Sequence, residues 1–416
     1  MGPETGESNR ARSADNGLAK GHRMLFDPKT LMQRAGDETG LSDFGSGPFQ
    51  DGLDVLCKAM REEARLNEYG TQNAFGRMLH ALTERLRLQD WFTRHPEILE
   101  QEIRRPVFLM GLPRSGTTAL AHFLAEDPVA RSPRNWEVQE LTPPPDAALG
   151  NDDPRYERQR LRCEAQERAH PGLQARLPVG PGDSTEHGSL LGYTFRSFVW
   201  PTLFRVPSYA EWLFKQDLLP SYQYLARILK LLQWRCPPDR WNLKYPHDTF
   251  GVREIRTVFP DAIILWSHRD PVGTIPSVCD LIATFRKADT DHLDRHELAE
   301  HLSELLAVGV ERAMSARDGL GDEGFVDVYQ ADLGANTVET VKSIYQRTGL
   351  PLTEDYLRLL DRRLTTVPRG HAGSYSYDMA DYGLTRETIQ GKFQRYIDRF
   401  GLGQGRYAAS GVRASA

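Results

Sequence analysis

The feature of this chain that most limits its fold is an apolar run that leads directly into a glycine-containing turn. Residues 107–112 read VFLMGL, and they are followed by PRSGTT at 113–118 and by an amphipathic segment that reaches about Glu126. A short continuous apolar run is typical of a buried strand, and the segment behind the turn has helical spacing. We therefore expect a strand, a tight turn and a helix in direct succession.

Three more short apolar runs have the character of buried strands, and they lie at 241–246, 262–269 and 325–333. Helical patterns separate them, at roughly 248–259, 273–287, 293–317 and 335–348. Buried strands that alternate with helices indicate a parallel sheet covered on both faces. The predicted fold class is α/β, with three layers and a central parallel sheet flanked by helices.

Changes in composition divide the chain into segments. A polar stretch at 1–26 is expected to be a disordered tail, and apolar residues at helical spacing predict an N-terminal helical extension over 27–100. The main domain is expected at 105–400 and a flexible tail at 401–416. Within the main domain, 143–235 has a charged and then an aromatic-rich half, and we interpret it as an insertion that shapes a substrate site.

Composition restricts the class of partner. The net charge is −5 over 416 residues, which argues against nucleic acid or an anionic membrane as the main partner. No run of 18 apolar residues predicts a membrane span, and the N-terminus lacks the apolar core of a signal peptide. The four cysteines are widely scattered, so we expect no metal site and a cytoplasmic location.

The turn at 111–118, GLPRSGTT, has the composition of an anion-binding loop. Backbone N–H groups converge where a strand hands over to a helix, and the helix N-terminus adds partial positive charge. Glycines allow the backbone to come close to the anion, and hydroxyl groups and a guanidinium add donors. We expect the anion to be bound by Arg114, Ser115, Gly116, Thr117 and Thr118.

Two other interpretations of this turn stay open. It can be an ordinary strand–helix turn without a ligand. Its spacing is also close to that of the P-loop of nucleotide kinases, but Thr117 stands where that loop has its lysine. The loop is therefore better suited to a single phosphate group than to a triphosphate with magnesium, and a P-loop-type kinase or phosphotransferase is kept as the alternative enzyme.

The loop and three later segments together resemble the sulfotransferases that use 3′-phosphoadenosine-5′-phosphosulfate (PAPS). LPRSGTT resembles their 5′-phosphosulfate loop in the bacterial and tyrosylprotein-type branch, where arginine replaces a lysine. Trp136-Glu137, LKYPHD at 243–248, the segment 259–281 and an aromatic-rich end at 382–400 follow in the same order. The resemblance spans about 105–400, and it implies a P-loop-like fold and transfer of a sulfuryl group from PAPS to a hydroxyl.

PAPS carries a separate 3′-phosphate, so the resemblance implies a second anion site. Arg269 ends an apolar run and Ser277 follows eight residues later, the interval that the family uses for this phosphate. An ion pair of Arg269 with Asp270 is the structural alternative. The family also closes a C-terminal loop over the nucleotide, and Arg369 in the segment 368–377 is the candidate for that role, with an ordinary solvated loop as the alternative.

Direct transfer of a sulfuryl group needs cations on the leaving phosphate and a base for the acceptor hydroxyl, without an obligatory metal. Arg114 and Lys244, the latter at the end of a predicted strand, are the candidate cations. Glu137 is the first choice of base, because tyrosylprotein-type relatives carry a catalytic glutamate in this region. His247 is the second choice, and Glu186 and His187 are the third.

The acceptor is the least determined part of the prediction. An aromatic-rich stretch from Tyr193 to Trp212 can line a large apolar pocket, although such stretches also form ordinary core. We expect a small-molecule, lipid or natural-product hydroxyl, because an acidic protein repels highly sulfated glycans. A non-catalytic nucleotide-binding protein is the alternative from a different functional class.

Overall fold

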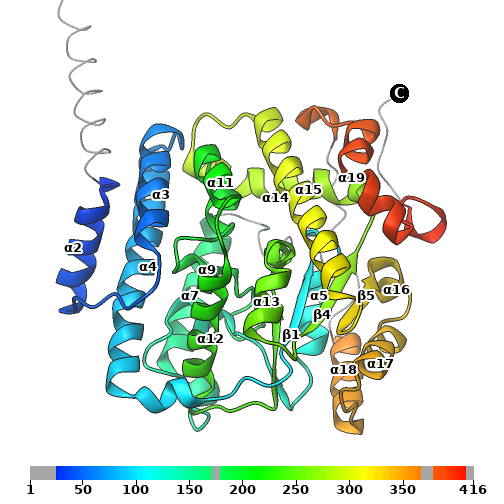
Figure 1. Cartoon of the computed structure of the whole chain (residues 1–416), viewed down its shortest axis with the longest axis horizontal. Helices are drawn as coiled ribbons and strands as arrows, with labels where there is room; N and C mark the ends of the chain where they lie inside the picture. The colour runs from blue at the N-terminus through cyan, green and yellow to red at the C-terminus, as the bar shows by residue number, and fades with distance from the viewer. Residues whose placement is uncertain (1–24, 170–171, 173–178, 367–377, 409–416) are drawn as a thin grey trace, which may run out of the picture.

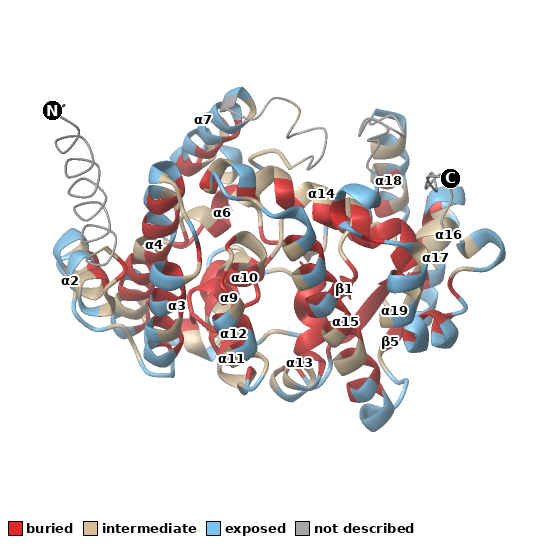
Figure 2. Ribbon diagram, turned by 90° about the horizontal axis from the view of Figure 1, so that it is seen from above, coloured by how far each residue is buried: buried red, intermediate tan, exposed pale blue. Residues whose placement is uncertain are grey.

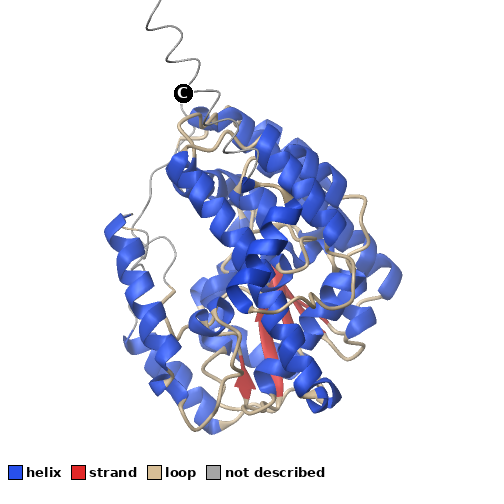
Figure 3. Cartoon of the chain, turned by 90° about the vertical axis from the view of Figure 1, so that its left-hand side faces the viewer, coloured by secondary structure: helices blue, strands red, loops and turns tan. Residues whose placement is uncertain are grey.

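The computed structural model describes residues 25–169, 172, 179–366 and 378–408. Five parallel strands form the sheet in these ranges, in the order β2-β3-β1-β4-β5. The strands are β1 (Val107–Gly111), β2 (Ala130–Arg131), β3 (Arg240–Lys244), β4 (Ile263–His268) and β5 (Phe325–Tyr329). They lie at the centre of the molecule and helices surround them (Figure 1, Figure 3).

Side chains of the strands alternate between two apolar layers. Leu109 of β1 packs with α5 (Thr117–Leu124), α17 (Thr337–Thr348) and α18 (Glu354–Thr366). Met110 packs on the opposite face, in the layer of α14 (Pro271–Asp289), α15 (Arg295–Leu320) and α19 (Arg386–Phe400). Because both faces are covered, every residue of β1 is buried, as its continuous apolar run predicts. The predicted three-layer α/β fold is confirmed.

The strand predicted at 325–333 is shorter in the structure. It pairs with β4 only as far as Tyr329, opposite His268, where β4 itself ends. Residues beyond that point have no neighbouring strand to bond to, and they form α16 (Gln330–Ala335) instead.

The N-terminal extension consists of α2 (Pro28–Thr39), α3 (Gln50–Glu62) and α4 (Glu68–Arg94). Asn67 caps α4, because its side chain accepts a bond of 2.8 Å from the backbone N–H of Gly70. These helices share one apolar cluster with α12 (Leu219–Gln233) and with Phe108 of β1. A Cβ at Gly70 would stand 2.0 Å from the carbonyl oxygen of Asp289, so glycine allows α4 to approach the end of α14. The extension is therefore packed on the main domain (Figure 1).

Helices build the inserted region between β2 and β3, and α12 is the last of them. The others are α6 (Asn135–Gln139), α7 (Pro154–Ala169), α9 (Gly188–Gly192), α10 (Val199–Leu203) and α11 (Pro207–Leu213). The charged α7 lies at the rim, whereas α9 is largely buried and α10 has no exposed residue (Figure 2). After β3 come η3 (Pro246–Phe250) and α13 (Val252–Val258).

The start of the expected C-terminal tail is packed on the domain. Leu402 is buried, and the ring of Tyr407 stacks on that of Tyr329 with centroids 4.5 Å apart. The expected N-terminal tail lies outside the described residues, apart from Leu25 and the fully buried Phe26. No helix in the described part of the chain is long and apolar enough to cross a membrane.

Candidate active site

The turn after β1 is held in one conformation by close backbone contacts. Gly111 has a φ of 137°, and a Cβ there would stand 2.3 Å from the carbonyl oxygen of Ser267 on β4. Ser115 is fully buried, its hydroxyl donates to the carbonyl of Leu112 at 2.6 Å, and its own carbonyl accepts from Ser267 Oγ at 2.7 Å. The side chain of Ser115 therefore fixes the loop from inside.

The helix α5 begins directly at the end of this turn. Gly116 precedes it with a φ of 91°, a conformation that favours glycine, and Thr117 and Thr118 form its first two positions. The first turn of a helix has backbone N–H groups without intrahelical partners, and its dipole favours an anion. The described geometry is thus that of an anion-binding helix start.

The structure brings both predicted anion sites together. The guanidinium of Arg269, just after β4, donates from Nη1 to the carbonyl oxygen of Arg114 at 2.9 Å. Arg114 Nε in turn donates to Ser277 Oγ at 3.3 Å, although Ser277 lies 163 residues further along the chain. Two arginines and a serine therefore converge at the carboxyl edge of β1 and β4, where ligands of α/β sheets bind. They come from the loop, from the residue directly after β4 and from α14.

A buried network fixes the end of β4 immediately before Arg269. His268 is hydrogen bonded through Nδ1 to the hydroxyl of Tyr396 and through Nε2 to Asp327, both at 2.9 Å. Arg317 donates to the same carboxylate at 2.7 Å. Burial alone raises the pKa of Asp327, but the hydrogen bonds from His268 and Arg317 outweigh it and hold the pKa well below its ordinary value. His268 is thus a structural neighbour of the site.

Lys244 connects the turn at 111–118 with the inserted region. It ends β3 beside Leu109 of β1, and only 3% of the residue is exposed. Its Nζ lies 2.8 Å from Oε1 of Glu186 and 3.4 Å from Oγ1 of Thr118. The side chain of Glu186 is 42% exposed, so this carboxylate is accessible from outside while it touches the buried ammonium group.

Glu137 lies in a different environment. It is 1% exposed, and its Oε1 accepts from Arg131 at 2.6 Å while its Oε2 accepts from the backbone N–H of Arg134 at 3.1 Å. Among the described residues no hydrogen bond or ion pair joins it to Lys244. Glu137 lines a surface groove with Pro145 and Cys236.

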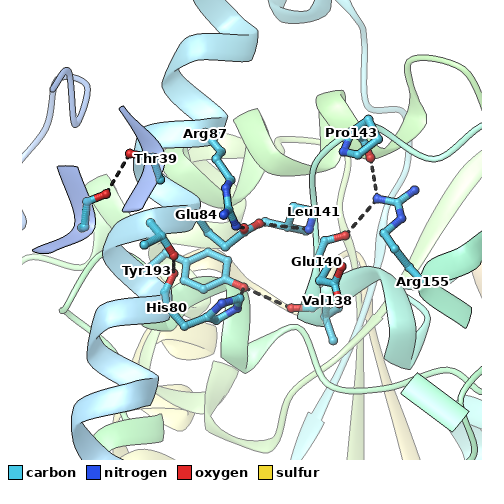
Figure 4. A network of polar contacts seen from close by, with 12 residues as sticks. Thr39, His80, Glu84, Arg87, Val138, Glu140, Leu141, Pro143, Arg155 and Tyr193 are labelled. Carbon is cyan, nitrogen blue, oxygen red and sulfur yellow. Dashed lines mark hydrogen bonds and ion pairs between the residues drawn. The ribbon is translucent and has the colours of Figure 1, made fainter. Parts of the chain in front are cut away.

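The segment that follows Glu137 is tied to its surroundings by polar contacts (Figure 4). The hydroxyl of Tyr193 donates to the carbonyl of Val138 at 3.1 Å, and the backbone N–H of Leu141 donates to Glu84 of α4 at 3.0 Å. Arg155 of α7 donates to the carbonyl of Glu140 at 3.0 Å. These contacts join the N-terminal extension to the inserted region, so Glu137 begins a rigid structural segment.

His247 lies on η3, three residues after Lys244. It is 6% exposed and stacks near the rings of Phe198 and Phe250, and its Nε2 lies 3.4 Å from Thr202 Oγ1. Burial lowers the pKa of His247 to about 4, so the ring is neutral at physiological pH. In the described part of the chain its Nδ1 has no hydrogen-bond partner.

The sequence did not single out Asp248, which is fully buried and hydrogen bonded to His187. The sequence feature that could have identified Asp248 is its position directly after His247, in a segment where polar residues follow the end of a strand. Arg369 lies outside the described residues. Within the described ranges, no group of three His, Cys, Asp or Glu side chains could hold a metal ion.

Comparison with known proteins assigns the family. The profile described as "Sulfotransferase family" matches residues 106–355. The fold is similar to the crystal structure of sulfotransferase STF9 from Mycobacterium avium, with 27% identity, a TM-score of 0.82, and 89% of this chain and 96% of that chain covered. It is also similar to sulfotransferase STF1 from Mycobacterium tuberculosis, with 30% identity, a TM-score of 0.79, and 88% and 97% covered. No curated protein sequence matched. The chain belongs to the sulfotransferase family.

Proposed function

We propose that this enzyme transfers a sulfuryl group from PAPS to the hydroxyl of a small-molecule, lipid or natural-product acceptor. The observation that carries the proposal is the junction of Arg114, Arg269 and Ser277 next to the start of α5. PAPS has two separate anionic groups, and this region offers two adjacent sets of donors. Arginine forks and serine hydroxyls suit phosphate dianions.

We assign one role to each residue that would bind the donor, PAPS. The backbone at the start of α5, with Thr117 and Thr118, binds the 5′-phosphosulfate. Arg269 and Ser277 bind the 3′-phosphate. Arg114 contacts both of these residues and also belongs to the loop that binds the 5′-phosphosulfate, so we place it between the two anionic groups of PAPS. Ser115 acts through its backbone, because its hydroxyl is already bonded within the loop. Arg369 remains the candidate for closing over the nucleotide.

The transfer step uses Lys244 and Glu186. The acceptor oxygen forms a bond to sulfur as the bond between sulfur and the bridging oxygen breaks, and that electron pair goes to the 5′-phosphate of the leaving adenosine 3′,5′-bisphosphate. Lys244 and Arg114 stabilise the charge that develops on this phosphate. The acceptor proton goes to Glu186, whose carboxylate is half-exposed and already lies 2.8 Å from Lys244 Nζ.

This assignment changes the order of the candidate bases. Glu137 was the first choice from the sequence, but both of its carboxylate oxygens are engaged by Arg131 and Arg134. His247 is neutral at physiological pH and able to accept a proton, but its pKa of about 4 makes it no stronger a base than an ordinary carboxylate, and its Nε2 lies near Thr202 and not near Lys244. We therefore place Glu186 first and assign His247, with the rings of Phe198 and Phe250, to the wall that contacts the acceptor.

A ligand-binding experiment separates this function from the kinase alternative. A ligand that binds only the folded protein raises its stability, by about 2.7 kcal/mol at a hundred times its dissociation constant. We expect adenosine 3′,5′-bisphosphate to raise the melting temperature clearly and ATP with magnesium to have a much smaller effect. A clear shift with ATP and none with the bisphosphate would overturn the assignment of PAPS as donor.

A further inference from the structure

The residue that follows the proposed base belongs to a second, fully buried polar group. His187 and Asp248 are both 0% exposed, and His187 Nε2 lies 3.2 Å from the Asp248 carboxylate. The hydroxyl of Tyr222 on α12 donates to the same carboxylate at 2.9 Å. A buried carboxylate is costly unless it is paired and hydrogen bonded, so this cluster needs both of its donors.

The cluster is connected to the proposed catalytic pair through the backbone. The N–H of His187 donates to the carbonyl oxygen of Lys244 at 3.2 Å, and the side chain of the preceding Glu186 reaches the ammonium group of the same lysine. The segment 186–187 therefore contacts Lys244 at both its main chain and its side chain.

The His187 ring is also held by packing. It meets the ring of Phe108 on β1 edge-on with centroids 5.8 Å apart and the ring of Tyr245 at 5.7 Å. Next to it, a Cβ at Gly188 would stand 2.3 Å from the Tyr245 ring, so glycine permits this packing. In the orientation that this packing favours, Nε2 of His187 faces Asp248, and Nδ1 has no hydrogen-bond partner in the described part of the chain. Because a carboxylate can only accept, Nε2 carries the proton.

We propose that His187 and Asp248 form a positioning pair that holds Glu186 against Lys244 beside the phosphate loop. The inference rests on the proposed function. A glutamate side chain that is half-exposed has several rotamers available, and a fixed main chain removes part of that freedom before the acceptor binds. Neither His187 nor Asp248 is exposed, so neither touches the substrates, and both act through Glu186.

Two amide substitutions that differ by one methylene group test the pair. The amide nitrogen of His187→Gln falls near the place of Nε2 and can still donate to Asp248, whereas that of His187→Asn falls near Nδ1 and cannot. We expect His187→Asn to lower kcat by about 10–100-fold with little change in KM for PAPS, a size seen when outer partners of an active site are removed. His187→Gln should recover most of that loss. Tyr345→Phe, which removes a buried hydroxyl bond to Asp127 elsewhere, is the control for stability alone.

The readout is release of adenosine 3′,5′-bisphosphate from PAPS with phenol, with 4-nitrophenol, and with water as acceptor. Because 4-nitrophenol is much more acidic than phenol and is already partly ionised near neutral pH, it needs less help from a base, and the loss in His187→Asn should be smaller with it than with phenol. Equal kcat for the Asn and Gln variants, or equal losses with both phenols, would overturn the positioning role. A wild-type protein that releases no bisphosphate with these three acceptors or with an extract of small molecules and lipids would instead refute the proposed function, and the positioning role with it.

Discussion

The donor half and the acceptor half of the candidate site are built in different ways. The donor half comes from two short contiguous segments, 111–118 and 269–277, which meet through the bonds among Arg114, Arg269 and Ser277. The acceptor half joins Lys244 to Glu186, which are 58 residues apart and belong to a strand and to the inserted region. Each of the two segments in the donor half is therefore a local motif, whereas the acceptor half joins single residues that only tertiary packing brings together.

We expect the donor half to determine mainly the affinity for PAPS and the acceptor half mainly the rate of transfer. Groups that contact the unreacting 3′-phosphate contribute binding that is the same in the ground state and the transition state, so they affect KM. Groups that touch the reacting atoms affect kcat. Substitutions in the donor half should therefore change KM for PAPS, whereas substitutions in the acceptor half should change kcat.

The largest loss is expected for Glu186→Gln. The substitution keeps the shape of the side chain but removes its capacity to accept the acceptor proton. Turnover with an un-ionised alcohol or phenol should fall by roughly 10²–10⁴, the usual contribution of a positioned base, with little change in the affinity for PAPS. Steady-state kinetics at saturating PAPS gives this value.

Glu137→Gln is the matched control for that experiment. It leaves Arg131 without its buried ion partner, and breaking such a pair costs about 3–5 kcal/mol of stability. We expect a lower melting temperature and nearly normal turnover in the protein that remains folded. Lost turnover at an unchanged melting temperature would make Glu137 the base after all.

Lys244→Met comes next in size. The side chain keeps most of its length and apolar stem but loses the charge next to Thr118. Removal of one group that stabilises charge in the transition state typically costs about 10²–10³ in kcat. A change confined to KM for PAPS would place Lys244 with the binding groups and remove the proposed distinction between the halves.

Smaller effects are expected for Arg269→Ala and Ser277→Ala. A hydrogen bond to a charged group contributes about 1.5–3 kcal/mol, so KM for PAPS should rise by roughly 10–100-fold at nearly constant kcat. Arg104→Ala, at an exposed arginine paired with Glu102, serves as the charge control and should change neither value. A loss of orders of magnitude in turnover at saturating PAPS would show that the second anion site is wrongly placed.

The smallest effect concerns His247 and pH. Burial lowers its pKa from 6.5 to about 4, so between these values the unfolded chain binds the proton and the folded protein does not. The contribution of His247 to the free energy of unfolding should therefore be fully present above pH 6.5. It should fall as the pH drops towards 4, by at most about 1.4 kcal/mol per pH unit. His247→Phe should reduce the slope of melting temperature against pH. An unchanged slope would show that the ring is already protonated when buried.

Much of the fold could be predicted because its signals are local. The continuous burial of β1 and β4 follows from apolar runs, and the helix start at Thr117 follows from the turn before it. The two-residue strand β2 was not predicted, because so short an element has no pattern of its own and exists through pairing with Arg240 and Trp241.

The acceptor half could be predicted only in part. Lys244 was identified because it ends an apolar strand, but nothing in the sequence near Glu186 indicates that it would reach this lysine. Glu137 was preferred because the resemblance to tyrosylprotein-type sulfotransferases implies a catalytic glutamate in this region, yet Glu137 is paired with Arg131, six residues before it. Which carboxylate meets which cation is decided by long-range packing that local patterns do not encode.

Direct observation of the transferred group tests the central claim. The purified protein is incubated with PAPS and a mixture of extracted small molecules and lipids, and mass spectrometry follows both the nucleotide and the acceptors. We expect an acceptor to gain one SO₃ for each adenosine 3′,5′-bisphosphate formed. Glu186→Gln should reduce the sulfated acceptor and the bisphosphate together. Tight binding of the bisphosphate without any turnover of PAPS would contradict the central claim and indicate a nucleotide-binding protein without sulfotransferase activity.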